Sequence, residues 1–326
     1  MRGLEVRHDS DAASSVYAVV LLGAAAWFVM AVGSWSGWPQ LGVIEVLFLL
    51  APWIVVPLAT SLIPSHDGAE PLTGRQRASK WIIFAAAALA TCSFFLPVGN
   101  LAASFAGAWL LVSAFFALRG LRRLWRYRAR SFSQFCFAMG EAYMVVGGTW
   151  LVASRLGLRP MGFQEPIVLL TAIHFHFAGF LSAVLAGLTY ERLRDTSWSK
   201  PLGAALAGVV VGPGLLGLAF LVGPKVKLAA VILIVVGQFG LATGMVRVAV
   251  GTANPVGRAM LLLSSGCVVA GMVLAATWAL GEYPMQAFVD LGRMERYHGA
   301  LNAVGFGISG LIGWMNAGRA KETVAA

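Results

Sequence analysis

Long apolar runs separated by short polar segments extend over the whole chain. A transmembrane helix needs about 20 mostly apolar residues to cross a hydrocarbon layer of ~30 Å. The pattern therefore predicts an all-α, polytopic membrane bundle of about ten transmembrane helices, with a kink at Pro52 and Pro57 in the second. The predicted spans are residues 16–34, 42–62, 80–97, 100–118, 133–154, 166–189, 202–222, 228–249, 258–279 and 297–316.

The basic residues alternate between the two sides of these predicted spans. Of the 24 Lys and Arg residues, 18 fall on the side that holds both termini and 6 on the opposite side. Because cytoplasmic loops are enriched in Lys and Arg, both termini are predicted to be cytoplasmic. The richest basic segment, residues 119–130, is interpreted as a loop that either sets this topology or binds anionic lipid headgroups.

Composition favours a single transmembrane domain over residues 1–326. Hydrophobic residues make up 59% of the chain and charged residues 12%, whereas soluble domains are about 25% charged. Only a short polar N-terminus, residues 1–14, and a short tail, residues 317–326, lie outside the predicted bundle. The net charge of +10 is carried by span ends and loops, which indicates membrane lipids, and no nucleic acid, as partners.

Ionisable side chains inside the predicted spans are rare, and they define the candidate site. A charge near the bilayer centre costs at least ~2.5–3.5 kcal/mol, so such groups usually face a cavity or a partner. His174 and His176 in the sixth span and Glu141 in the fifth lie at similar predicted depths. The two histidines point about 200° apart on an α-helix, so we expect only one to face the site. The competing interpretation gives each residue a private partner, for example Tyr143 or Gln134 for Glu141.

Further polar residues extend this candidate site. His298 and Asn302 are four residues apart and share one face of the tenth span. Gln238 reaches mid-depth in the eighth span, and Glu45 lies in the outer quarter of the second. We therefore expect a shared polar cavity between the fifth, sixth and tenth spans.

Three short runs carry a resemblance to a known family. They are His174-Phe-His-Phe-Ala-Gly-Phe180, Tyr297-His-Gly-Ala-Leu-Asn-Ala-Val-Gly-Phe306, and Gly140-Glu141 followed by Gly147-Gly-Thr-Trp150. These runs resemble the YndJ-like family of bacterial membrane proteins. The resemblance covers mainly the fifth, sixth and tenth spans. It implies a multi-pass protein of the bacterial cytoplasmic (inner) membrane and selects the same histidines, but it implies no mechanism.

The leading interpretation is an intramembrane enzyme of the isomerase or cyclase type, acting on an apolar lipid, isoprenoid or polyene. A neutral imidazole and a buried carboxyl can pass protons across a double bond, and a shielded site protects developing charge from water. His176 and Glu141 are assigned as acid and base, with His174 and His298 as their catalytic neighbours. The expected substrate contacts are Asn302, Gln238, Glu45, Tyr143, Trp150 and Tyr297.

Other classes of function stay open at this point. His176, His298 and Glu141 form a two-histidine, one-carboxylate set that would suit iron or a haem oxidoreductase, although each ligand comes from a different predicted helix, and the sequence specifies no cofactor. The same residues could relay protons in a proton-coupled transporter. A non-catalytic membrane assembly protein is the remaining alternative.

Overall fold

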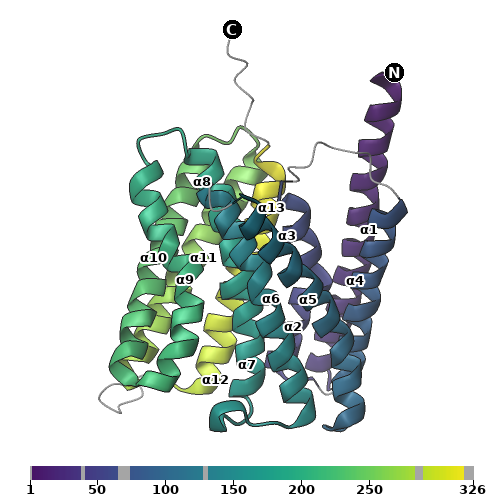
Figure 1. Ribbon diagram of the computed structural model, residues 1–326, viewed down its shortest axis with the longest axis vertical. Helices are drawn as coiled ribbons and strands as arrows, with labels where there is room; N and C mark the ends of the chain where they lie inside the picture. Colours follow the sequence, from purple (N-terminus) through teal and green to yellow (C-terminus); the bar gives the residue numbers. More distant parts are fainter. Residues whose placement is uncertain (1, 38–40, 65–73, 128–130, 283–288, 319–326) are drawn as a thin grey trace. The chain divides into compact units, whose positions relative to one another are not determined.

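The structure is a computed structural model that describes residues 2–37, 41–64, 74–127, 131–282 and 289–318. Helices joined by short connections make up these residues, and the described part of the chain contains no β-strand (Figure 1). The chain divides into a first unit, Met1–Arg123 with Ala138–Leu181, and a second unit, Leu124–Phe137 with Ser182–Ala326. The predicted all-helical membrane fold is confirmed.

The first unit is built from the N-terminal helices and the middle of the chain. Within it, α1 contacts α2, η1, α3 and α4, and α2 contacts α7. Its elements are α1 (Arg2–Trp35), α2 (Val43–Leu50), η1 (Ala51–Val55), α3 (Val56–Leu62), α4 (Gly74–Ser93), most of α5 (Asn100–Tyr127) and α6 (Phe132–Leu156), η2 (Pro160–Gly162), α7 (Ile167–His174) and η3 (Phe175–Leu181).

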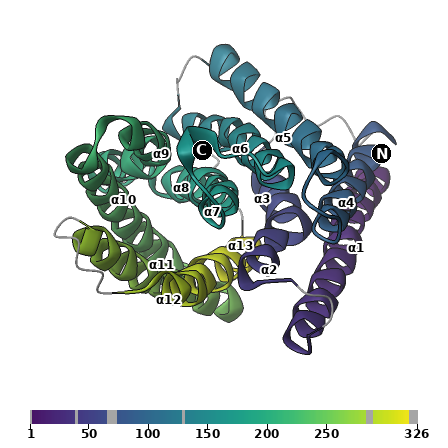
Figure 2. The ribbon, with the colours of Figure 1, turned by 90° about the horizontal axis from the view of Figure 1, so that it is seen from below.

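The second unit holds the C-terminal helices. In this unit α10 packs against α9 on one side and α11 on the other (Figure 2). Glycines allow this close packing, since a Cβ atom on Gly237 of α10 would lie 2.7 Å from the backbone nitrogen of Val209 in α9. Its elements are α8 (Ser182–Leu193), α9 (Ser199–Val222), α10 (Pro224–Val250), α11 (Pro255–Glu282), α12 (Leu291–Arg293), η4 (Met294–His298), η5 (Leu301–Ile308) and α13 (Ser309–Asn316).

Eight helical segments of the described residues are long and apolar enough to cross a membrane: Ala18–Trp35, Val43–Leu62, Asn100–Arg126, Phe132–Leu156, Ile167–Leu193, Ser199–Val222, Pro224–Val250 and Pro255–Gly281. The other two predicted spans are helical as well. One corresponds to the shorter apolar segment Lys80–Ser93. The other lies in residues 291–316, which are helical throughout but divided among α12, η4, η5 and α13.

One predicted boundary differs from the structure, and another agrees. The first candidate span, Ala18–Trp35, begins close to the predicted residue 16, and helix α1 extends back from it to Arg2. Helix α5 continues through most of the basic segment that was interpreted as a loop, and it ends at Tyr127. Arginine and leucine are strong helix formers, and arginine can hold its charge in water while its methylene stem stays on an apolar surface.

The predicted proline kink appears as the π-helical segment η1 between α2 and α3. Pro57 has no N–H group and cannot donate the helical hydrogen bond that the Trp53 carbonyl would otherwise accept. Helix α1 approaches this carbonyl closely, because a Cβ atom on Gly23 would lie only 2.5 Å from Trp53 O. Short π-helical segments are frequent at functional sites, and the described residues contain three more: η3, η4 and η5.

Candidate functional site

Glu141 lies on α6 and forms an ion pair with arginines of α5. Its Oε1 atom accepts hydrogen bonds from Arg119 Nε at 3.0 Å and Arg119 Nη2 at 2.7 Å. Arg123 Nη2 lies 3.7 Å from the same oxygen. The carboxylate side chain is 0% exposed, whereas those of Arg119 and Arg123 are 38% and 13% exposed. These three residues are called the Glu141 cluster.

The local sequence explains how this cluster assembles. Arg119 and Arg123 are one turn apart on α5, so they point to the same side of the helix. Gly120 lies between them and lets the two helices meet, since a Cβ atom there would be 2.4 Å from Ala138 O and 2.8 Å from Glu141 Cβ. The two guanidinium groups compensate the charge of a carboxylate that is cut off from water.

The second carboxylate oxygen of Glu141, Oε2, distinguishes this cluster from a fully bonded ion pair. Glu141 Oε2 is buried and has no hydrogen-bond partner among the described residues. Buried polar atoms almost always have a partner, and an orphaned one costs about 1–3 kcal/mol, more when it is charged. The cluster therefore leaves one acceptor of this buried carboxylate without a donor among the described residues.

His176 lies in η3 and is fully buried with both ring nitrogens engaged. The indole of Trp109 donates from Nε1 to His176 Nε2 at 2.9 Å. Because indole is only a donor, the histidine proton lies on Nδ1, which donates to Ala172 O at 2.7 Å. Phe48 packs edge-on against the imidazole at 5.4 Å between ring centroids. The ring is thus neutral, oriented and fully bonded within the core.

His174 points away from this core. Its side chain is exposed, and Nδ1 lies 2.7 Å from the carbonyl oxygen of Leu170 in the preceding turn. The expected opposite orientation of His174 and His176 is confirmed: one histidine is exposed and the other is buried. The change from α7 to η3 occurs between them, at Phe175.

His176 and Glu141, which were predicted to act as acid and base, are not hydrogen-bonded to each other in the described part of the chain. Their joint catalytic role stays a prediction. His176 packs against Gly147, where a Cβ atom would lie 2.6 Å from Nδ1. Gly147 is six residues beyond Glu141 on α6, which corresponds to about 9 Å along the helix axis at 1.5 Å per residue. Glu141 therefore lies at a different level from His176, on the level of Arg119, and each of the two has partners of its own.

The other predicted residues of the first unit have separate surroundings. Glu45 is half-buried in the first turn of α2, and its charge acts on Arg155 at the end of α6. The ring of Tyr143 is buried against Phe175, 5.5 Å away. The ring of Trp150, a half-buried residue, contacts that of Phe163 at 6.4 Å. Their assignment as substrate contacts stays a prediction.

The remaining predicted residues belong to the second unit. His298 Nδ1 lies 2.9 Å from Gly271 O on α11, and Asn302 Nδ2 donates to the His298 carbonyl oxygen at 2.8 Å. Tyr297 is exposed. Gln238 Nε2 donates to Ser182 Oγ at 3.1 Å, while its buried Oε1 has no partner among the described residues. The shared cavity expected from residues of both units stays a prediction.

The described part of the chain contains no ligand set that would support the metal-binding alternative. There, no three His, Cys, Asp or Glu side chains gather closely enough to hold a metal ion. In the first unit, Glu141 bonds to arginine and His176 to tryptophan.

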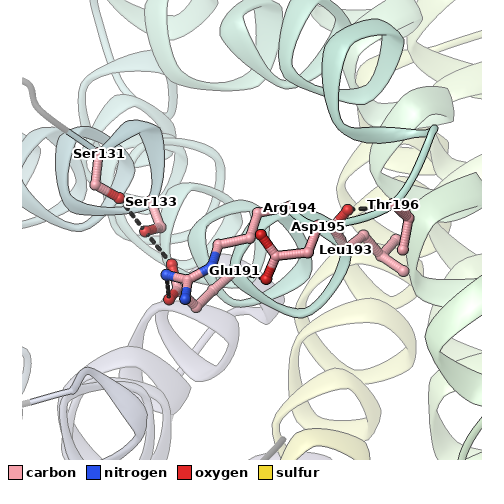
Figure 3. A network of polar contacts seen from close by, with 7 residues as sticks. All are labelled: Ser131, Ser133, Glu191, Leu193, Arg194, Asp195 and Thr196. Atoms are coloured by element: carbon pink, nitrogen blue, oxygen red, sulfur yellow. Dashed lines mark hydrogen bonds and ion pairs between the residues drawn. The ribbon is translucent and has the colours of Figure 1, made fainter. Parts of the chain in front are cut away.

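A second polar network lies at the junction of α6 and α8 in the second unit (Figure 3). Ser133 Oγ donates to Glu191 Oε2 at 2.5 Å, and Arg194 Nη1 donates to Glu191 Oε1 at 2.5 Å. Ser131 and Ser133 exchange a further hydrogen bond of 2.7 Å. Both carboxylate oxygens of Glu191 have partners, so this network closes on itself, in contrast to the Glu141 cluster.

Sequence reasoning missed three residues of the candidate site: Arg119, Arg123 and Trp109. The two arginines were assigned to a loop, but their four-residue spacing around Gly120 was a usable signal for a helix face that meets another helix. Nothing in the sequence distinguished Trp109 as the partner of a histidine 67 residues away.

Comparison with known proteins identifies the family of this chain. A family model described as YndJ-like protein matches residues 46–306. The chain belongs to the YndJ-like family. The Glu141 cluster, His176, His298 and Asn302 all lie inside the matched region, so the predicted resemblance is confirmed on the residues that carried it.

A curated relative of this YndJ-like protein is the "Uncharacterized membrane protein YndJ" of Bacillus subtilis (strain 168), which is 26% identical over 287 residues. The match covers 85% of the chain and 49% of the relative, so the chain spans about half of that protein's length. No solved structure matches the chain. The relative and the eight candidate spans establish a multi-pass membrane protein.

Proposed function

We propose that this YndJ-like protein is an intramembrane enzyme of the bacterial cytoplasmic membrane, and that Glu141 exchanges protons with a lipid- or isoprenoid-type substrate. The observation that carries the proposal is the buried Oε2 atom of Glu141, which has no partner among the described residues. Ionisable groups in membrane spans are expensive and are usually functional. An ion pair in which both carboxylate oxygens have donors is explained by its structural role alone. A buried carboxylate oxygen without a donor indicates a further role.

The arginines and the open oxygen have complementary roles in this proposal. Arg119 holds Oε1 with two hydrogen bonds and fixes the orientation of the carboxylate. Oε2 accepts a proton from one carbon of the substrate, and the electron pair of the broken C–H bond forms a new double bond. The same oxygen returns the proton to a second carbon as the old double bond opens, so one carboxylate serves as base and then as acid.

The proposal gives the histidines a different role from the one expected at first. Both nitrogens of His176 are engaged, so this ring has no free lone pair to offer a substrate. It fixes η3 against α5 and α6 through Trp109 and Gly147. The proposal rests on the first unit alone and requires no contribution from His298.

Deuterium transfer from solvent tests the proposal. The purified protein would be reconstituted into vesicles of a total bacterial lipid extract in D₂O, and each lipid class would be examined by mass spectrometry for carbon-bound deuterium. Within a turnover, exchange with D₂O of the abstracted proton, during the time that Glu141 holds it, predicts labelling of one lipid class by the wild type and background labelling by Glu141→Gln.

A matched control uses the second ion pair of the chain. Glu191→Gln makes the same chemical change in a carboxylate whose two oxygens are both bonded, and it should label lipid as the wild type does. Wild-type labelling no higher than in protein-free vesicles, or equal labelling by Glu141→Gln, would contradict the proposal.

A further inference from the structure

One exposed face of α5 changes from apolar to basic along its length. Leu111, Phe115 and Leu118 are 74%, 57% and 55% exposed, and Arg122 follows on the same face and is also exposed. Successive spacings of four, three and four residues place these side chains on one stripe of the helix. This stripe, residues 111, 115, 118 and 122, is called the α5 stripe.

The two ends of the α5 stripe suit the two parts of a lipid. Three large apolar side chains within about two turns offer a surface for an acyl chain. Arg122 stands at the end that the positive-inside rule assigns to the cytoplasm, where phosphate headgroups lie. A planar guanidinium group binds phosphate oxygens with two parallel hydrogen bonds.

Arg122 differs from Arg119 and Arg123 on α5 because its side chain does not bond to Glu141. Arg119 and Arg123 are directed at Glu141, on the side of α5 that faces α6. The side chain of Arg122 makes no hydrogen bond or ion pair with the residues that the structure describes. Its charge is therefore available at the lipid-facing surface, and Arg119, which is 38% exposed and one turn away, adds positive potential beside it.

We propose that the α5 stripe is a binding site for an anionic phospholipid, with Arg122 on the headgroup phosphate and Leu111, Phe115 and Leu118 along one acyl chain. The site is independent of the chemistry proposed for Glu141, because it lies on the exposed face of α5. A purely topogenic role for Arg122 would require a positive charge near the interface but no preference among bound lipids.

Native mass spectrometry of the purified protein in mild detergent tests this site. Phosphatidylglycerol and phosphatidylcholine with identical acyl chains would be titrated against wild type and against Arg122→Gln. An arginine near an anionic surface contributes about 1 kcal/mol, which is about a fivefold change in affinity. Arg122→Gln should therefore bind phosphatidylglycerol about fivefold more weakly and phosphatidylcholine as the wild type does.

Two further variants and one competitor make the result decisive. Arg122→Lys keeps the charge and should retain most of the preference. Arg159→Gln removes an exposed arginine that lies outside α5, between α6 and η2, and should have no effect. Inorganic phosphate should fail to displace the bound lipid, because the acyl chain contributes to binding. An unchanged lipid preference in Arg122→Gln, an equal loss for both lipids, or displacement by free phosphate would overturn the proposal.

Discussion

Removing Arg119 is expected to destabilise the protein more than removing Glu141. The substitution Arg119→Gln deletes the donors at 3.0 and 2.7 Å from Glu141 Oε1 and leaves only Arg123, at 3.7 Å. Breaking a buried ion pair costs about 3–5 kcal/mol because one charge stays buried without its partner. Since Arg123 remains and Arg119 is 38% exposed, we expect a cost at or below the lower limit of this range, about 2–3 kcal/mol.

A double-mutant cycle isolates the interaction between these two residues. Glu141→Gln leaves Arg119 able to reach water, so its cost should be about 1–2 kcal/mol. The double variant should lose less than the sum of the two single variants, with a coupling of about 1–3 kcal/mol. Equilibrium unfolding in mixed detergent micelles, followed by tryptophan fluorescence, measures each term.

The control for this cycle is Arg122→Gln, the exposed neighbour on the same helix. It should change the unfolding free energy by no more than about 0.5 kcal/mol and add independently to Glu141→Gln. If Arg119→Gln and Glu141→Gln were additive within about 0.5 kcal/mol, the reasoning about the Glu141 cluster would be refuted.

Three other changes have defined outcomes. Gly147→Ala places a Cβ atom 2.6 Å from His176 Nδ1 and should cost about 1–3 kcal/mol of unfolding free energy. The control Gly107→Ala, with nothing within 4 Å of its Cβ, should be neutral or stabilising. Equal effects of the two substitutions would contradict the packing of His176 against Gly147. Trp109→Phe leaves His176 Nε2 without its donor and should lower the unfolding free energy by about 1–3 kcal/mol in the same assay. An unchanged unfolding free energy would show that this hydrogen bond does not stabilise the protein. A cysteine at the exposed Trp125, with the three native cysteines replaced by alanine, should react with an impermeant thiol reagent only from the cytoplasmic side; labelling from outside would reverse the predicted topology.

The helical fold was predictable because a bilayer offers the backbone no water for hydrogen bonding. Apolar runs of spanning length must satisfy their own hydrogen bonds, so each predicts a helix directly. The fifth predicted span, residues 133–154, corresponds closely to α6, Phe132–Leu156. The π-helical segments were not predictable, because they depend on how neighbouring helices pack; η3 begins at Phe175 in a run whose composition equally fits an α-helix.

The candidate site was predictable only in part, for a reason that Glu141 illustrates. Its cost in a membrane span identified it as a candidate site residue without knowledge of any partner. Its actual partners, Arg119 and Arg123, depend on which faces of α5 and α6 meet, and one sequence does not specify that register. The orientations of His174 and His176 were predictable because they follow from helix geometry alone.

The most direct test of the account is a cryo-electron microscopy map of the protein in nanodiscs of bacterial lipid, at a resolution that shows bound lipid and water. The account predicts an elongated density that ends within hydrogen-bond distance of Glu141 Oε2, the buried oxygen without a partner among the described residues. Density in which Oε2 is bonded to another side chain of the protein, or to no molecule at all, would contradict it.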